Sequence, residues 1–322
     1  MLSNAKVSPM LKVEFRCYQR PFKQPLQTHH GLWEVRQGII LRLSDRQQTS
    51  WGEIAPLEAF GSESFEQALQ FCQSLTEIDR HEISQIPAPL SACRFGFESA
   101  WEGLKDGAPA RKSTYSSLLP TGSAAIHSWR SLWNQGARTF KWKIGVAPTQ
   151  KELEVFEELV TALPAQTQLR LDANGGLNWD EANLWLRKCD RYGVEFLEQP
   201  LPPNQFDAML QLSRQYQTPI ALDESVATLE QLERCYELGW RGIFVVKAAI
   251  AGSPERLRSF CRSHAIDIVW SSVFETAIAQ RYIQNCLIPS VSTGERAIGF
   301  GVNHWFDDDL NQLDFEQLWQ SL

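Results

Sequence analysis

Five charged residues recur along the second half of the chain at intervals of one strand-plus-helix repeat. They close the short apolar runs in "TFKWKIG", "TQLRLDANG", "VEFLEQPL", "TPIALDES" and "GIFVVKAA", and they lie 24 to 29 residues apart. When parallel strands form a barrel, their carboxyl ends meet at one rim, and charged residues there are typical of an active site. The spacing therefore predicts that the five converge: Lys143, Asp172, Glu198, Asp223 and Lys247.

Each stretch also has an ordinary structural interpretation. "DANGG" is a turn signal, "EQPLPP" is a strand stopped by prolines, and "ALDES" is a helix N-cap. These interpretations explain each stretch alone but not the shared spacing. The spacing favours the joint functional interpretation.

Three of the five are carboxylates, and no histidine or cysteine accompanies them at this spacing. Asp172, Glu198 and Asp223 would form an oxygen-rich site, which suits Mg²⁺, or Mn²⁺ in its place, and leaves coordination positions for substrate oxygens. We expect these three residues to be the metal ligands.

Two lysines lie one residue apart in the first of these runs. Lys141 and Lys143 project to one face of a strand, while Phe140 and Trp142 project to the other. Alone, such a pair is more commonly a solvent-facing edge. Beside a divalent cation and a second lysine, however, a lysine has a lowered pKa and becomes a usable general base.

The third lysine, Lys247, would face this pair from the opposite side of the barrel. A divalent cation can stabilise the enediolate that forms when the carbon beside a carboxylate loses its proton. We expect one of these lysines to take the proton.

Three polar residues beside the predicted ligands are candidates to orient them. They are Asn174, Gln199 and Glu224. Each is equally typical of a turn or a helix cap.

The elements that must position these residues follow from periodicity. The first hundred residues alternate like an antiparallel meander and continue into "SESFEQALQFCQSLTEI", an amphipathic helix that begins behind a serine cap. From about residue 115, eight apolar strand candidates alternate with amphipathic helices, the eighth being "CLIPSVSTG" at residues 286–294. Eight such units favour a closed barrel over an open sheet, and no G-x-G-x-x-G follows any strand.

Composition excludes several classes of protein. The chain has 322 residues, 43% of them hydrophobic, and a formal net charge of −7 without a basic run, so we expect neither nucleic acid nor membrane insertion. The seven cysteines form no C-x-x-C pair and are expected to be reduced. We predict a cytoplasmic protein.

These motifs resemble the enolase superfamily, and within it the muconate lactonizing enzyme subgroup. The resemblance implies a (β/α)7β-type TIM barrel with an N-terminal α+β capping domain that carries the specificity loops. It places the cap at residues 1–95, the barrel at 96–295 and a segment returning to the cap at 296–322. It implies a small-molecule carboxylate as substrate, and we expect a monomer or a homodimer.

Within the subgroup, the chain is most similar to the o-succinylbenzoate synthases. "GEIAPLEAFGSES", "SACRFGFESA" and "SSVFETAIA" carry this resemblance. It implies a Mg²⁺-dependent dehydration of 2-succinyl-6-hydroxy-2,4-cyclohexadiene-1-carboxylate to o-succinylbenzoate, a step of menaquinone and phylloquinone biosynthesis. It also implies that Lys143 removes the proton, that Lys141 tunes Lys143, and that Lys247 stabilises the enediolate from the other face. Substrate contacts at the barrel rim would come from Ser271, Ser272 and Gly294.

Two alternatives remain. N-succinylamino acid racemase has the same lysines and metal ligands, so the residues of the site do not separate it from the synthases. A barrel without catalysis that serves as a binding scaffold is the non-enzymatic alternative, and the intact set of clustered acids argues against it.

Overall fold

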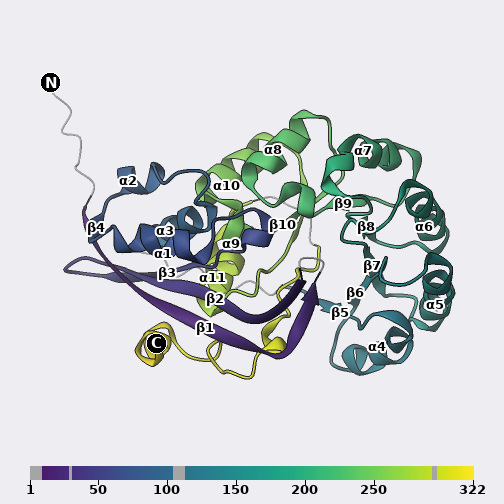
Figure 1. The fold of residues 1–322 in the computed structure, drawn as a ribbon, viewed down its shortest axis with the longest axis horizontal. Coiled ribbons are helices and arrows are strands. Elements are labelled where there is room, and N and C mark those ends of the chain that lie inside the picture. Colours follow the sequence, from purple (N-terminus) through teal and green to yellow (C-terminus); the bar gives the residue numbers. More distant parts are fainter. Residues whose placement is uncertain (1–8, 29–30, 104–112, 292–295) are drawn as a thin grey trace.

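The molecule consists of an antiparallel sheet that lies across the mouth of a parallel barrel (Figure 1). The structure, a computed structural model, describes residues 9–28, 31–103, 113–291 and 296–322. The mixed α/β architecture, with a barrel and an N-terminal sheet domain, confirms the expected fold class. The predicted boundaries after residues 95 and 295 stay a prediction.

The cap is built on a four-stranded antiparallel sheet in the order β3-β2-β1-β4. Helix α1 begins behind Ser64, whose side chain accepts a hydrogen bond from the backbone of Gln67, while the Gln67 side chain accepts one from the Ser64 backbone. The predicted meander and capped helix are thus confirmed. The elements of the cap are β1 (Leu11–Thr28), β2 (Gly31–Ser44), β3 (Thr49–Ile54), β4 (Glu77–Ile78), α1 (Phe65–Gln73), α2 (Arg80–Ser84) and α3 (Ser91–Gly103).

Helix α3 crosses β3 at a point where both backbones carry glycine. A Cβ atom on Gly52 would lie 2.2 Å from the carbonyl oxygen of Gly96, and one on Gly96 would lie 2.9 Å from that of Glu53. Only glycine permits this close approach. The contact explains a glycine in each of the motifs "GEIAP" and "RFGFESA". It packs β3 closely against α3.

The barrel sheet has seven parallel strands in the order β11-β10-β9-β8-β7-β6-β5. Helices α4 to α8 form an arc around the outside of these strands (Figure 1). The strands are β5 (Ser116–Leu118), β6 (Thr139–Lys143), β7 (Gln168–Asp172), β8 (Phe196–Glu198), β9 (Ile220–Leu222), β10 (Ile243–Val246) and β11 (Asp267–Trp270). The helices are α4 (Ala125–Asn134), α5 (Thr149–Ala162), α6 (Trp179–Tyr192), α7 (Phe206–Gln215), α8 (Leu229–Glu237), α9 (Ala248–Ala251), α10 (Pro254–Ser263), α11 (Ala277–Tyr282) and α12 (Ile288–Ser290).

The prediction of an eighth strand at residues 286–294 was wrong for residues 286–290, and residues 292–294 lie outside the described ranges. Residues 283–290 are helical, with a π-helical turn at Ile283–Leu287 that continues into α12. Short apolar runs fit a buried strand and a buried helix equally well, which explains the error. The closing position belongs instead to the segment that follows residue 296, where Ile298 bridges Tyr115 beside β5 and Gly299 bridges Ser271 beside β11.

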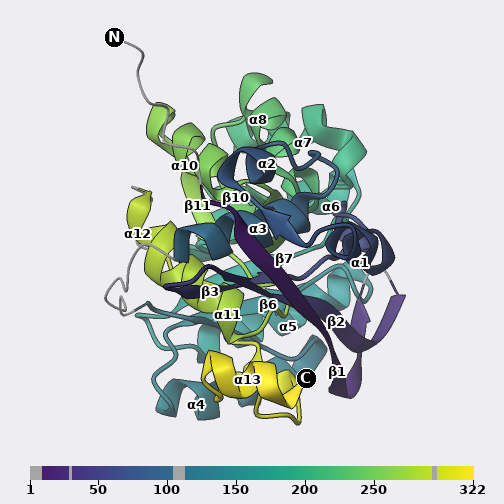
Figure 2. The same cartoon turned by 90° about the vertical axis from the view of Figure 1, so that its left-hand side faces the viewer.

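The C-terminal segment leaves the barrel and packs against the cap. Phe306 pairs with Phe22 of β1 as an isolated bridge, and their rings stack at 4.9 Å. Arg20 of β1, whose side chain is buried, donates to Asp308 at 2.8 Å. Helix α13 (Phe315–Ser321) then lies beside the cap sheet, as Figure 2 shows. Both ends of the described chain therefore contribute to the cap.

Two general properties bear on the expected environment. Within the described ranges, no helix is long and apolar enough to cross a membrane. All seven cysteines are free thiols.

Candidate functional site

Strand β6 places two lysines on the inner side of the barrel. Phe140 and Trp142 alternate with them and are fully buried on the outer side. The Trp142 ring meets Trp185 of α6 edge to face at 6.3 Å. Since side chains alternate along a strand, this outer packing directs Lys141 and Lys143 inward, as the sequence predicted.

The three carboxylates lie at the carboxyl ends of neighbouring strands. Asp172 ends β7, Glu198 ends β8, and Asp223 follows the last residue of β9. Each is at most 6% exposed. The ammonium group of Lys141 lies between the first two, 2.8 Å from Asp172 Oδ2 and 2.5 Å from Glu198 Oε1. Lys141 thereby joins the ends of three strands.

Lys247 follows β10 and is also buried. Its ammonium group forms an ion pair with Asp223 and lies 4.5 Å from the centroid of the Phe60 ring. Phe60 belongs to a 3₁₀ turn of the cap, Glu58–Phe60. The lysine is therefore held between a barrel carboxylate and an aromatic ring of the cap.

Burial and mutual repulsion change the protonation of the acid cluster. Burial raises the pKa of Glu198 to about 8, with the charges of Asp172 and Asp223 acting in the same direction against the opposing charge of Lys141. Burial and the charge of Asp223 likewise raise the pKa of Glu224 to about 7. Burial disfavours the charged form of Lys141, but the neighbouring carboxylates outweigh it and raise its pKa. The carboxylates therefore favour the charged form of Lys141, which suits its predicted role of tuning Lys143 rather than the role of a base.

A divalent cation fits the chemistry of this cluster. Among the described residues, no three histidine, cysteine, aspartate or glutamate side chains are arranged to hold a metal ion, and Lys141 and Lys247 are paired with oxygens of the predicted ligands. Two further oxygens beside them, Glu224 Oε2 and Asn174 Oδ1, are buried without a hydrogen-bond partner. A buried set of oxygen donors with excess negative charge suits Mg²⁺. The ligand roles of the three carboxylates stay a prediction.

Two of the three residues predicted to orient the ligands, Gln199 and Asn174, contact a predicted ligand, and the third, Glu224, is bound to Asn174. The side-chain oxygen of Gln199, which is fully buried, accepts from the backbone amide of Asp223 at 3.0 Å, and its amide group donates to Ser225 Oγ at 2.8 Å. Asn174 donates its backbone amide to Asp172 Oδ1 and its side-chain amide to Glu224 Oε1, both at 3.0 Å. Polar side chains here connect the ends of β7, β8 and β9.

A cavity of about 130 Å³ lies between these strand ends and the cap. Lys143 and Lys247 both line it, together with Ser272. Of the other predicted substrate contacts, Ser271 continues β11 and pairs with Gly299, and Gly294 lies outside the described residues. The remaining residues that line the cavity are Leu26, Trp33, Leu57, Phe60, Asn174, Glu224, Val273 and Phe274.

Two cap residues that bind the loop after β11 at the barrel rim were not identified from the sequence. The Glu53 carboxylate of β3 accepts from both the backbone amide and the hydroxyl of Thr276, and the Arg36 guanidinium of β2 donates to the carbonyl oxygen of Val273 at 2.8 Å. Both cap side chains are buried. A charged residue in an apolar strand was the available signal, and the motif "GEIAP" contains Glu53 itself.

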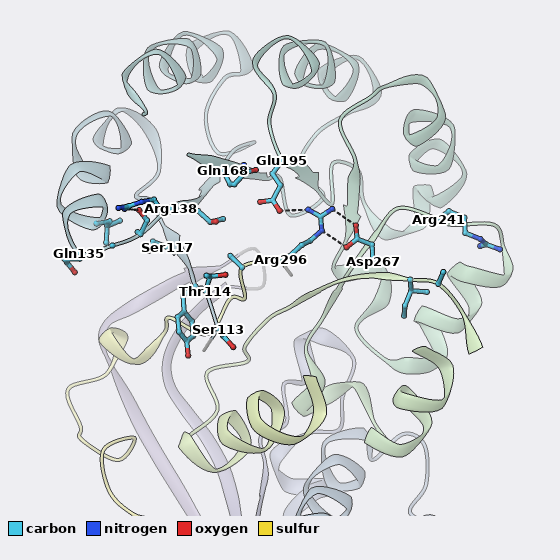
Figure 3. A pocket seen from close by; sticks show the side chains of 18 residues that line it. Ser113, Thr114, Ser117, Gln135, Arg138, Gln168, Glu195, Arg241, Asp267 and Arg296 are labelled. Carbon is cyan, nitrogen blue, oxygen red and sulfur yellow. Dashed lines mark hydrogen bonds and ion pairs between the residues drawn. The ribbon is translucent and has the colours of Figure 1, made fainter. Parts of the chain in front are cut away.

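A larger cavity, about 1150 Å³, lies at the opposite end of the barrel (Figure 3). Its central charges pair with one another, since Arg296 binds Glu195 at 2.7 Å and Asp267 at 2.7 Å. Charged residues at the amino-terminal ends of barrel strands typically serve stability rather than chemistry. The smaller cavity, with its two lysines and acid cluster, is therefore the candidate active site.

Two family models and a curated relative match this chain over most of its length. The family described as "Enolase C-terminal domain-like" matches residues 124–310, and "MenC, N-terminal domain" matches residues 10–104. An o-succinylbenzoate synthase of Thermosynechococcus vestitus is 39% identical over 97% of this chain and 99% of its own length.

Solved structures are similar to this chain as well. The crystal structure of o-succinylbenzoate synthase from Thermosynechococcus elongatus BP-1, with Mg in its active site, superposes with a TM-score of 0.89 at 38% identity, over 97% of this chain and 100% of that chain. An N-succinyl Arg/Lys racemase from Bacillus cereus superposes with a TM-score of 0.78 at 16% identity, over 94% of this chain and 90% of that chain, and shows the fold alone.

Proposed function

Because the chain belongs to the o-succinylbenzoate synthase family, within the enolase-like proteins, we propose that it dehydrates 2-succinyl-6-hydroxy-2,4-cyclohexadiene-1-carboxylate to o-succinylbenzoate. The chain is an enzyme of the carbon–oxygen lyase class, and its product belongs to menaquinone and phylloquinone biosynthesis. The observation that carries the proposal is the cavity that Lys143 and Lys247 line together beside the buried acid cluster. A lysine base beside a second lysine and a buried acid cluster suits proton removal from the carbon next to a carboxylate.

Lys143 and Lys247 have different roles in the proposed reaction. Lys143 takes the proton from the carbon that bears the carboxylate, and the electrons of that bond move toward the carboxylate. The ammonium group of Lys143 then gives the proton to the departing hydroxyl, so that the ring loses one water molecule. Lys247 remains charged and stabilises the negative charge that develops on the substrate.

Asp172, Glu198 and Asp223 would hold Mg²⁺, or Mn²⁺ in its place. When bound, the cation supplies electrostatic stabilisation of the substrate carboxylate. Lys141 lies between two of these carboxylates and limits their repulsion. Calorimetric titration with Mg²⁺ tests this assignment, because Asp223→Asn should remove the heat of binding. Unchanged binding by that variant would exclude Asp223 as a ligand.

The reaction itself is tested by the ultraviolet absorbance of the aromatic product. Wild type with substrate and Mg²⁺ should turn over, and Lys143→Ala should show no activity above background because it lacks both the base and the acid. Lys151→Ala, which removes an exposed lysine of α5, is the matched control and should retain full activity. An inactive wild type would refute the proposed function.

The same preparation separates the synthase from a racemase. A racemase must exchange protons on both faces of its intermediate, so both lysines would act as bases. Wild type that racemises an N-succinylamino acid faster than it dehydrates the cyclohexadiene would assign it to the alternative.

We also propose that the protein works in the cytoplasm as a monomer or a homodimer. The seven free thiols support a reducing compartment. Light scattering of the purified protein measures its assembly.

A further inference from the structure

Phe274, in the loop after β11, has a backbone conformation that bulky residues rarely adopt. Its φ is +63°, and the only other described residues besides glycine with a positive φ are Asn174 and Gln199, beside the predicted ligands. In the left-handed region, the Cβ of a bulky L-residue crowds its own backbone. Such a conformation persists only when neighbouring contacts impose it, and it is common at ligand-binding positions.

A closed set of hydrogen bonds imposes this conformation. Ser272 Oγ accepts from the backbone amide of Phe274 at 2.9 Å and donates to Glu275 Oε2, also at 2.9 Å. The same oxygen of Glu275 accepts from the amide of Val273 at 2.6 Å. From the cap, Arg36 donates to the carbonyl oxygen of Val273. The turn is therefore fixed by contacts on both sides of Phe274.

The turn directs Phe274 to the cavity that contains the two lysines. Phe274 lines this cavity with Trp33 and Phe60 of the cap, and we call these three residues the aromatic wall. The rings of Trp33 and Phe274 meet edge to face at 6.4 Å, and those of Trp33 and Phe60 at 6.3 Å. Lys247 contacts the Phe60 end of the wall. The cavity thus combines cations with an apolar aromatic surface.

We propose that Phe274 is a specificity-determining residue, whose ring packs against the six-membered ring of the substrate and of its aromatic product. The inference rests on the proposed function. The lysines attract the carboxylate of such a ligand, so its unsaturated ring is left to face the aromatic wall. Rings prefer edge-to-face or offset contact, which a preset backbone can align without an entropic cost at the time of binding.

The test compares two ligands in the presence of Mg²⁺. One is o-succinylbenzoate, and the other is N-succinylglycine, which has a succinyl group and a carboxylate but no ring. Isothermal calorimetry should show that Phe274→Ala lowers the affinity for o-succinylbenzoate about tenfold, which is the size of an aromatic pair contact. The affinity for N-succinylglycine should fall less than about twofold. Phe274→Leu keeps apolar volume, so its affinity should fall about threefold, and only for o-succinylbenzoate.

The control is Phe306→Leu. Phe306 meets Phe274 at 6.2 Å in the same aromatic cluster but does not line the cavity. This variant should leave the ratio of the two affinities unchanged. Equal weakening of both ligands by Phe274→Ala and by Phe274→Leu would overturn the inference, since Phe274 would then only support the loop. Failure of wild type to bind o-succinylbenzoate would refute the proposed function, and the inference with it.

Discussion

Lys247 has two contacts that a change of side chain can separate. Its charge is paired with Asp223, and its ammonium group faces the ring of Phe60. We expect Lys247→Ala to lower kcat/KM by about 2 to 4 kcal/mol in activation free energy, the typical value of one electrostatic group in an active site. Lys247→Arg should retain measurably more dehydration, because arginine keeps the charge but cannot act as a base. Steady-state assays of both variants provide the measurement.

The opposite outcome is equally informative. If arginine is as inactive as alanine at this position, proton transfer rather than charge is the function of Lys247. Racemisation by wild type would then be the expected companion result.

Gln199 connects two neighbouring strand ends without contacting the cavity. Because its oxygen accepts from the amide of Asp223, Gln199→Ala should weaken Mg²⁺ binding by about 10- to 100-fold, as loss of an orienting contact commonly does. Calorimetry measures the affinity, with Gln205→Ala, an exposed residue before α7, as the control. Equal affinities in wild type and Gln199→Ala would show that the backbone alone positions Asp223.

At the scale of elements, β3 of the cap is bound to α11 of the barrel by one carboxylate. Glu53 is fully buried and accepts from Tyr18, Thr276 and Ala279. Glu53→Gln replaces an acceptor by a donor opposite other donors, so we expect a loss of about 2 to 3 kcal/mol in the free energy of unfolding.

Urea denaturation measures this loss. Glu66→Gln, which changes an exposed acid in the first turn of α1, should cost less than about 1 kcal/mol. A loss of similar size in both variants would contradict the assigned function of Glu53 as the connection between cap and barrel.

The sequence predicts elements better than it predicts their contacts. The spacing of Lys143, Asp172 and Glu198 revealed the parallel strands, because each repeat needs about the same length of chain. The closing segment around Ile298 escaped prediction because it is held by isolated bridges and is too short for a periodic pattern. The conformation of Phe274 escaped too, since a positive φ in a bulky residue depends on the side-chain hydrogen bonds of Ser272 and Glu275, which no sequence pattern marks.

At the scale of the whole molecule, Glu275 couples stability to pH. Burial raises its pKa from an ordinary value of 4.5 to about 7, and the charge of Glu53 adds to this shift. The folded protein therefore binds a proton that the unfolded chain has released, and stability falls as pH rises between about 4.5 and 7. We expect Glu275 to contribute a decrease on the order of 3 kcal/mol over this range.

Comparison with Glu275→Gln isolates that contribution, because the variant cannot titrate at this position. Between pH 5 and pH 8, the free energy of unfolding should decrease more for wild type than for the variant. Parallel pH profiles would show that Glu275 remains ionised throughout, or that its charge is fully compensated.

The C-terminal segment that packs on the cap also sets an order of events during synthesis. Residues of β1 leave the ribosome before the barrel, whereas Phe306, Asp308 and α13, which cover that strand, are made only after all seven strands of the barrel sheet. Domains generally fold as units as the chain emerges. Here the cap acquires its outer packing after the barrel strands exist, so a nascent chain exposes apolar surface of the cap until α13 has been made. Chaperones that shield emerging chains would therefore bind the apolar surface of β1 before the active site has formed.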